Sequence, residues 1–183
     1  MYFLKPISNE VRLSQIIFNK HKKTMKLILV SILSCMAAIL QAAGAVPGIG
    51  YCISPLSTAP ILLCSMFSIP FGAMSYFLTI MLLFILQPTE IIAFPFTTGM
   101  LGLGIGASFH FYKMRLSIIA TGAILLMLGI TSLIVIFHFP VLGPAVSVSF
   151  SFLIFGFLFA FIYSWLWVEI ALILFKRLKT IRI

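Results

Sequence analysis

The segment from Gln87 to Gly99 holds the side chains whose types and spacing best suit ligand binding. It carries one carboxylate, two aromatic rings and two adjacent hydroxyls: Glu90, Phe94, Phe96, Thr97 and Thr98. Pro95 lies among them, and a proline inside a helix cannot donate its backbone hydrogen bond, so it frees a carbonyl of the preceding turn. Flat apolar walls with a few placed polar groups are typical of a site for an amphipathic small molecule. The alternative is a kinked helix end whose threonines bond to their own backbone.

Two titratable residues accompany this segment. Glu90 would accept a hydrogen bond from a ligand, bind a cation, or lie in headgroup water, and we prefer water. Its position after Pro88 and Thr89 also suits the first turn of a helix, where a carboxylate offsets the helix dipole. His138 ends a later apolar run and is a further candidate for ligand binding, with placement at the membrane interface as its simpler interpretation.

Nothing in the chain forms a catalytic constellation. There is no Asp, the Glu residues stand apart, and neither a GxSxG nor an HExxH motif occurs. Intramembrane hydrolases and transferases usually need paired acids or a His/Asp cluster. The three cysteines show no CxxC spacing, which gives no reason to expect a metal site. We therefore expect no enzymatic activity, no cofactor and no metal.

The charge distribution shows which elements must position these residues. Residues 27–175 contain four charged side chains, which are Glu90, Lys113, Arg115 and Glu169. Each charge near the bilayer centre costs about 2.5–3.5 kcal/mol, so a segment this poor in charge is built for lipid. We expect an all-α integral membrane protein with one bundle at residues 25–178, located as a multi-pass protein in a bacterial cell membrane. The net charge of +9 does not indicate nucleic-acid binding, because the basic residues flank apolar runs.

The twelve Lys and Arg residues form three clusters, at 5–26, 113–115 and 176–182. Basic residues flank the cytoplasmic ends of membrane spans, so an even number of spans should separate the clusters. Apolar runs at 26–45, 90–111, 116–139 and 145–175 give four spans. The remaining run, 57–87, is long for one helix and short for two, because a full crossing needs about 20 residues.

The run at 57–87 decides the topology. Read as one helix, it gives five spans and leaves the second and third basic clusters outside the cell. Read as two short helices broken between Ser68 and Gly72, it gives six spans with all three clusters inside. Pro70 and Gly72 lie close together and favour a break there. We predict six transmembrane helices, the second and third short, with both termini cytoplasmic.

The two ends of the chain leave alternatives open. Residues 1–24 are either an interfacial helix on anionic lipid or a basic tail, and residues 179–183 are predicted as a short cytoplasmic tail. The first span also fits a signal peptide, with a basic region at 20–26, an apolar core at 27–40 and a cleavage site at 43–45. Charge alone does not exclude cleavage, because the other basic clusters would still lie inside.

Small residues indicate where helices approach one another closely. Ser34, Ala38 and Ala42 recur every fourth position of the first span. Gly102 and Gly106 form a GxxxG on the fourth span, for which close helix packing is expected. For the first stripe, packing within the bundle and docking on a partner membrane protein both remain open.

Three features together resemble the S component, the substrate-binding membrane subunit, of energy-coupling factor (ECF) vitamin transporters. They are the small-residue stripe, the stretch 53–60 that enters a short helix followed by 71–76, and the turn 95–99 that enters a glycine-rich span. The resemblance covers about residues 25–175. It implies that the stripe of Ser34, Ala38 and Ala42 contacts a transmembrane coupling subunit that works with ATPase subunits. It also implies that segments 47–58, 89–98 and 138–147 enclose a vitamin-like solute.

The expected function is therefore a membrane-embedded, small-solute-binding subunit of an ECF-type uptake transporter. The chain itself has no P-loop, so ATP hydrolysis would belong to the partner subunits. The alternative is a non-transporting multi-pass membrane protein, such as an immunity, assembly or accessory factor.

Overall fold

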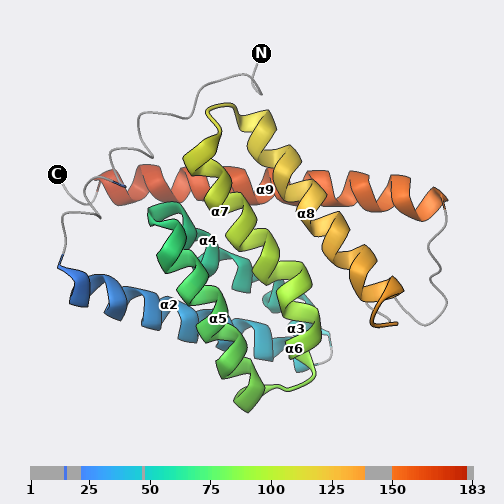
Figure 1. Ribbon diagram of the computed structural model, residues 1–183, viewed down its shortest axis with the longest axis horizontal. Helices are drawn as coiled ribbons and strands as arrows, with labels where there is room; N and C mark the ends of the chain where they lie inside the picture. Colours follow the sequence, from blue (N-terminus) through green and yellow to red (C-terminus); the bar gives the residue numbers. More distant parts are fainter. Residues whose placement is uncertain (1–14, 16–21, 47, 139–149, 181–183) are drawn as a thin grey trace.

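The computed structural model describes Gln15 and residues 22–46, 48–138 and 150–180, and the ordered elements of these residues are helical (Figure 1). Five helices are long and apolar enough to cross a membrane: Lys23–Ala45, Ile69–Leu86, Glu90–Phe111, Arg115–Val135 and Ser151–Leu174. A shorter apolar helix occupies Ser54–Phe67. The lengths and compositions of these helices indicate a multi-pass membrane protein.

Six main helices follow one another along the chain. They are α2 (Lys23–Ala42), α4 (Thr58–Phe67), α5 (Ile69–Leu86), α7 (Met100–Phe111), α8 (Arg115–Val135) and α9 (Phe150–Thr180). Shorter pieces join them: η1 (Ala43–Ala45), α3 (Ile49–Ile53) and η2 (Ser54–Ser57) precede α4. The helix α6 (Glu90–Phe94) and the π-helical turn η3 (Pro95–Gly99) precede α7. The predicted fourth span, 90–111, therefore has the bounds of α6, η3 and α7 taken together.

The long apolar run divides at Ser68, within the predicted break. Ser68 is extended, with φ −163° and ψ 131°, and separates α4 from α5. Pro70 lies in the first turn of α5, where its missing N–H would have no partner in any case. With 18 residues, α5 is about 27 Å long, which approaches the thickness of a bilayer core. The expectation that this helix would be short is therefore corrected.

The helix α4 lies inside the bundle. Its 10 residues extend only about 15 Å, half of a crossing. Most of its side chains are buried, and it packs against α2, α5, α7 and α9. Lipid offers no hydrogen bonds to exposed backbone. A helix as short as α4 is therefore stable at membrane depth only where protein surrounds it. Five span-length helices and this short one stand where six spans were predicted.

Glycines permit the closest contact of α4. A Cβ added to Gly106 would lie 2.8 Å from Oγ of Ser65 and 2.9 Å from the carbonyl oxygen of Leu62. A Cβ added to Gly102 would lie 2.9 Å from the carbonyl oxygen of Thr58. The GxxxG pair of α7 thus brings its backbone against α4, and the prediction of close helix packing is confirmed.

Many large apolar side chains lie on the outside of the bundle. Phe84, Ile85 and Phe155 are 68%, 79% and 72% exposed, and many other large apolar side chains are exposed, most of them to a smaller extent. Patches of this extent are rare on soluble monomers. They suit a surface solvated by lipid chains.

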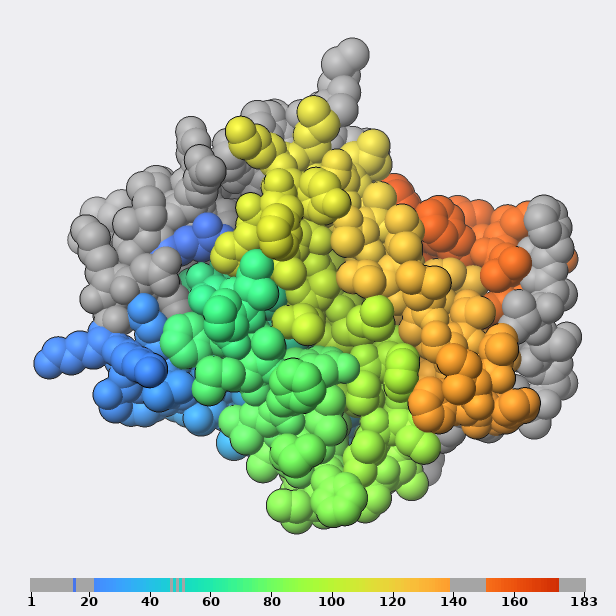
Figure 2. All heavy atoms as spheres, viewed as in Figure 1, coloured from blue at the N-terminus to red at the C-terminus, as the bar shows by residue number. Residues whose placement is uncertain are grey.

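The arrangement of the helices brings both ends of the bundle to one side. Helices α5, α7 and α8 form one face of the molecule (Figure 2). The start of α2 and the end of α9 lie on the same side, at the left of Figure 1. The orientation of these ends relative to a membrane stays a prediction.

Several predicted segments fall partly or wholly outside the described residues. Of the predicted tail 1–24, the structure describes Gln15 and residues 22–24, and α2 already begins at Lys23. The fifth span was expected to reach 139, but α8 ends at Val135. Of the predicted loop 138–147, the structure describes His138 alone. The predicted tail at 179–183 begins within α9, which continues to Thr180.

Candidate functional site

A polar cluster joins four elements at the end of α2, and Gln41 is its centre. The Gln41 side chain is 3% exposed, and its Nε2 donates to Oε2 of Glu90 at 2.8 Å. Its Oε1 accepts hydrogen bonds from Oγ of Ser57 at 2.6 Å and from Oγ1 of Thr98 at 2.9 Å. We call Gln41, Ser57, Glu90 and Thr98 the Gln41 cluster. Both ends of the Gln41 amide are thus held by residues distant in the sequence.

Local geometry explains why Glu90 and Thr98 share one face. An α-helix returns to the same face after seven residues, because 3.6 residues make a turn. A π-helical turn adds one residue to that repeat. The turn η3 lies between Glu90 and Thr98, which are eight positions apart, so both side chains reach Gln41. The sequence cause is Pro95, the first residue of the π-helical turn, which breaks the regular hydrogen-bond ladder.

One carboxylate oxygen of the cluster has no hydrogen-bond partner among the described residues. Oε2 of Glu90 is bonded to Gln41, whereas Oε1 accepts no hydrogen bond from any residue that the structure describes. Glu90 is half-buried in the first turn of α6, and Oε1 lies on the side of Gly44, where an added Cβ would be 3.8 Å away. The cluster therefore offers a carboxylate acceptor beside the hydroxyls of the buried Ser57 and the half-buried Thr98.

The threonines of the predicted site behave differently from each other. Thr98 donates to Gln41, whereas Thr97 donates to the carbonyl oxygen of Ala93 at 2.7 Å, as the kinked-helix alternative expects. Glu90 lies in a first helical turn as predicted, and its Oε2 accepts a hydrogen bond from Gln41. Its placement in headgroup water stays a prediction.

The structure does not bring the two predicted aromatic walls together. Phe94 is fully buried and stacks on Tyr76, with ring centroids 6.1 Å apart. The Tyr76 hydroxyl donates to the carbonyl oxygen of Pro95 at 3.2 Å. Phe96 instead packs beside Phe137, with centroids 5.2 Å apart. Phe94 thus belongs to the core, and Phe96 to the contact with the end of α8.

His138 lies beyond the end of α8. It is exposed and has a φ of 50°, in the left-handed region that most side chains avoid. It follows Phe137, which touches Phe96, but no hydrogen bond joins it to the Gln41 cluster in the described part of the chain. Its ligand-binding role stays a prediction.

The small-residue stripe of the first span packs inside the bundle. Ser34 and Ala38 are 0% exposed, and Ala42 is half-buried. Oγ of Ser34 donates to Oγ of Ser75 at 2.9 Å, and Thr79 donates to the Ser34 carbonyl oxygen at 3.4 Å. The stripe thus joins α2 to α5. Docking of a coupling subunit on these side chains stays a prediction, and it would require α2 and α5 to separate.

A second charged contact lies away from the Gln41 cluster. Arg115, at the start of α8, pairs with Glu169 of α9 at 3.2 Å, and the two side chains are 15% and 24% exposed. The pair joins α8 to α9 and satisfies an acid inside an apolar helix.

Sequence reasoning missed Gln41, although a signal was present. Gln41 is the one amide side chain between residues 27 and 45, in an otherwise apolar and small-residue run. A lone amide in a membrane helix needs a partner, because lipid provides none. Ser57 fell within the predicted ligand-enclosing segment 47–58 but was not singled out.

No protein-family model, curated protein or solved structure matches this chain. The resemblance to ECF S components therefore rests on the sequence features given above. The function has to be argued from the residues of the chain itself.

Proposed function

We propose that this chain binds a small solute at the Gln41 cluster, as the membrane-embedded binding subunit of an ECF-type uptake transporter. The observation that carries the proposal is the hydrogen bond between the buried Gln41 and the half-buried Glu90. An acid and an amide inside a membrane bundle are costly, and such residues mark solute pathways and binding sites by default. Here four separate elements supply the cluster, and the solute would join them at one point.

The chemistry of the cluster suggests the class of solute. Oε1 of Glu90 is an acceptor, and the Gln41 carbonyl already accepts two hydroxyl hydrogen bonds. A solute that donates hydrogen bonds, through an ammonium, amide or hydroxyl group, complements this arrangement. Its apolar part would lie against the surrounding helices.

The position of the cluster fits uptake from outside. Gln41 lies in the last turn of α2, at the end opposite Lys22 and Lys23. In the predicted topology that end faces outward, away from the basic cytoplasmic cluster. A solute from outside would then reach Glu90 first.

The non-transporting alternative is also favoured by an observation. Ser34 and Ala38 are fully buried against α5, and the Gln41 amide is satisfied without any ligand. In an accessory protein, the cluster would serve only to fix the ends of α2 and α6. The two functions differ in whether the cluster holds a solute.

A matched pair of threonine variants separates these functions. The protein is purified in mild detergent, and native mass spectrometry measures the retained small molecule and any co-purified ATPase subunits. Thr98→Val removes a hydroxyl of the cluster at nearly constant volume, and loss of a buried hydrogen-bond partner costs about 1–3 kcal/mol. Solute affinity should fall roughly 5- to 150-fold. Thr97→Val removes a hydroxyl that bonds only to its own helix, and solute retention should stay at the wild-type level.

Two results would contradict the proposal. One is equal retention by both folded variants, which would place the site away from the cluster. The other is folded wild-type protein that carries neither a small molecule nor partner subunits, which would favour the accessory function.

A further inference from the structure

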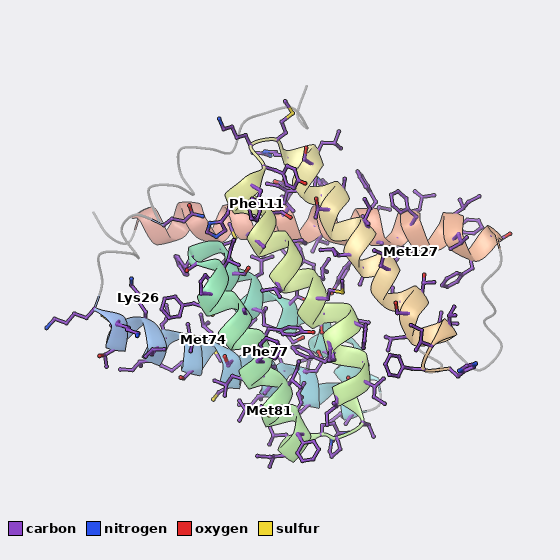
Figure 3. The ribbon with its side chains drawn as sticks, viewed as in Figure 1. Lys26, Met74, Phe77, Met81, Phe111 and Met127 are labelled. Atoms are coloured by element: carbon purple, nitrogen blue, oxygen red, sulfur yellow. The ribbon has the colours of Figure 1, made fainter. Side chains whose placement is uncertain are left out.

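A groove of about 410 Å³ runs between α2 and α5. Three residues of α2 and five of α5 line it: Leu27, Val30, Ser31, Ala73, Met74, Phe77, Leu78 and Met81. Figure 3 shows Met74, Phe77 and Met81 following one another along α5. The volume lies within the range of about 300–1,000 Å³ that is usual for ligand sites.

The sequence explains the shape of the groove. At the hydrogen bond between Ser34 and Ser75, small side chains let α2 and α5 touch. Next to this point Val30 is buried and Ala73 is short, so they form a floor. Large exposed side chains of α5, including Met74 and Phe77, form the rim. Methionine is flexible and polarizable, which suits contact with an occupant of variable shape.

The lining is complementary to an apolar occupant about as long as one leaflet of the bilayer is deep. The hydroxyl of Ser31 donates to the carbonyl oxygen of Leu27 at 3.0 Å, so this one polar side chain is already satisfied. The lining residues of α5 run from Ala73 to Met81, about 12 Å along the helix. Half of a 30 Å hydrocarbon core is about 15 Å. A single acyl chain reaches from headgroup to midplane over that depth.

Basic side chains lie next to the groove at the start of α2. Lys23 and Lys26 precede Leu27 and Val30 by four positions, so they lie on the same helix face, one turn toward the N-terminus. Figure 3 shows Lys26 in the first turns of α2. Lys22 and Lys23 are exposed, and the first turn of α2 holds no acid. Basic side chains at the cytoplasmic end of a membrane helix attract anionic lipid.

We infer that this groove is a specific site for an anionic phospholipid. One acyl chain lies against Val30 and Ala73, and the headgroup meets Lys22, Lys23 and Lys26. A zwitterionic lipid with the same chains fills the groove but gains less from the lysines. The site is separate from the Gln41 cluster and does not depend on the proposed function.

Native mass spectrometry with defined lipids tests the inference. The detergent-purified protein is titrated with phosphatidylglycerol and with phosphatidylcholine of identical acyl chains. Wild-type protein should bind phosphatidylglycerol more tightly than phosphatidylcholine. The double variant Lys22→Gln/Lys23→Gln should lower the affinity for phosphatidylglycerol about 5- to 25-fold, since each surface lysine contributes about fivefold. Binding of phosphatidylcholine should change little. Lys113→Gln removes an exposed charge away from the groove and should leave both affinities within about twofold.

Filling the groove provides the second arm. Ala73→Phe should lower the affinity for both lipids. If this variant does not fold, Ala73→Leu is the smaller replacement. Equal binding of the two lipids in wild-type protein, or an equal loss with Lys113→Gln, would overturn the inference. So would a protein dimer that Ala73→Leu abolishes, because a second copy of the chain would then occupy the groove.

Discussion

Gln41 shows how much a single side chain reveals about this protein. Its presence in an apolar run is plain from the sequence, and the need for a partner follows from the absence of water in lipid. Its partners cannot be predicted from the sequence, because Ser57 and Thr98 contact Gln41 only through the turns of η2 and the π-helical geometry of η3. A lone amide such as Gln41 can be identified from the sequence, whereas the local backbone geometry determines which side chains contact it.

Glu169 and Arg115 give a prediction at the same scale. Glu169→Leu leaves the partly buried Arg115 without its carboxylate, which should lower the free energy of unfolding by about 1–3 kcal/mol. Replacing both residues, as in Arg115→Met with Glu169→Leu, should restore part of that loss, because no uncompensated charge remains. Thermal unfolding in detergent measures each variant. Strictly additive effects of the two substitutions would show that the pair is not coupled.

At the scale of elements, the sequence predicts the break at Ser68 and the span 90–111, but not the full length of α5. Pro70 and Gly72 mark the break at Ser68, and the run 90–111 matches the helix that was predicted. The brevity of α4 beside the full length of α5 depends on the glycines of α7, which cover α4 from a distant part of the sequence. A pattern read along one segment does not contain that information.

Two glycines of α7 should differ in their tolerance of alanine. A Cβ at Gly106 would meet Ser65 and the backbone oxygen of Leu62, which cannot move without shifting α4. A Cβ at Gly104 would meet only the end of the Leu125 side chain, which can rotate away. Overpacking costs about 1–3 kcal/mol, whereas alanine gains about 1 kcal/mol over glycine in a helix. Gly106→Ala should therefore melt at a lower temperature than Gly104→Ala, and equal melting temperatures would argue against close packing of α7 on α4.

At the scale of the whole molecule, the side of the membrane on which each basic cluster lies stays a prediction. The start of α2 and the end of α9 lie on one side in Figure 1, and Lys113 follows α7. An even number of passes between the basic clusters, with α4 returning the chain before α5, stays a prediction, because α4 extends only about half of a crossing. The sequence predicts this arrangement from charge asymmetry, which acts on the whole chain and does not depend on packing detail.

Cysteine accessibility tests that topology. In a variant without Cys35, Cys52 and Cys64, Lys113→Cys should react with an impermeant maleimide only after the cells are permeabilised. Thr89→Cys, in the exposed turn before α6, should react in intact cells. Labelling of residue 113 from outside would rule out six passes with cytoplasmic ends.

The buried position of α4 also constrains how the protein is made. Synthesis of α4 begins at Thr58, whereas α7, which covers it, begins 42 residues later at Met100. At about 5–20 residues per second the ribosome needs roughly 2–8 s to cover that distance. Throughout that time α4 is too short to span and has only α2 and the emerging α5 beside it. A nascent chain that stops before Met100 therefore leaves a half-length helix flanked by α2 and α5 but not covered by α7.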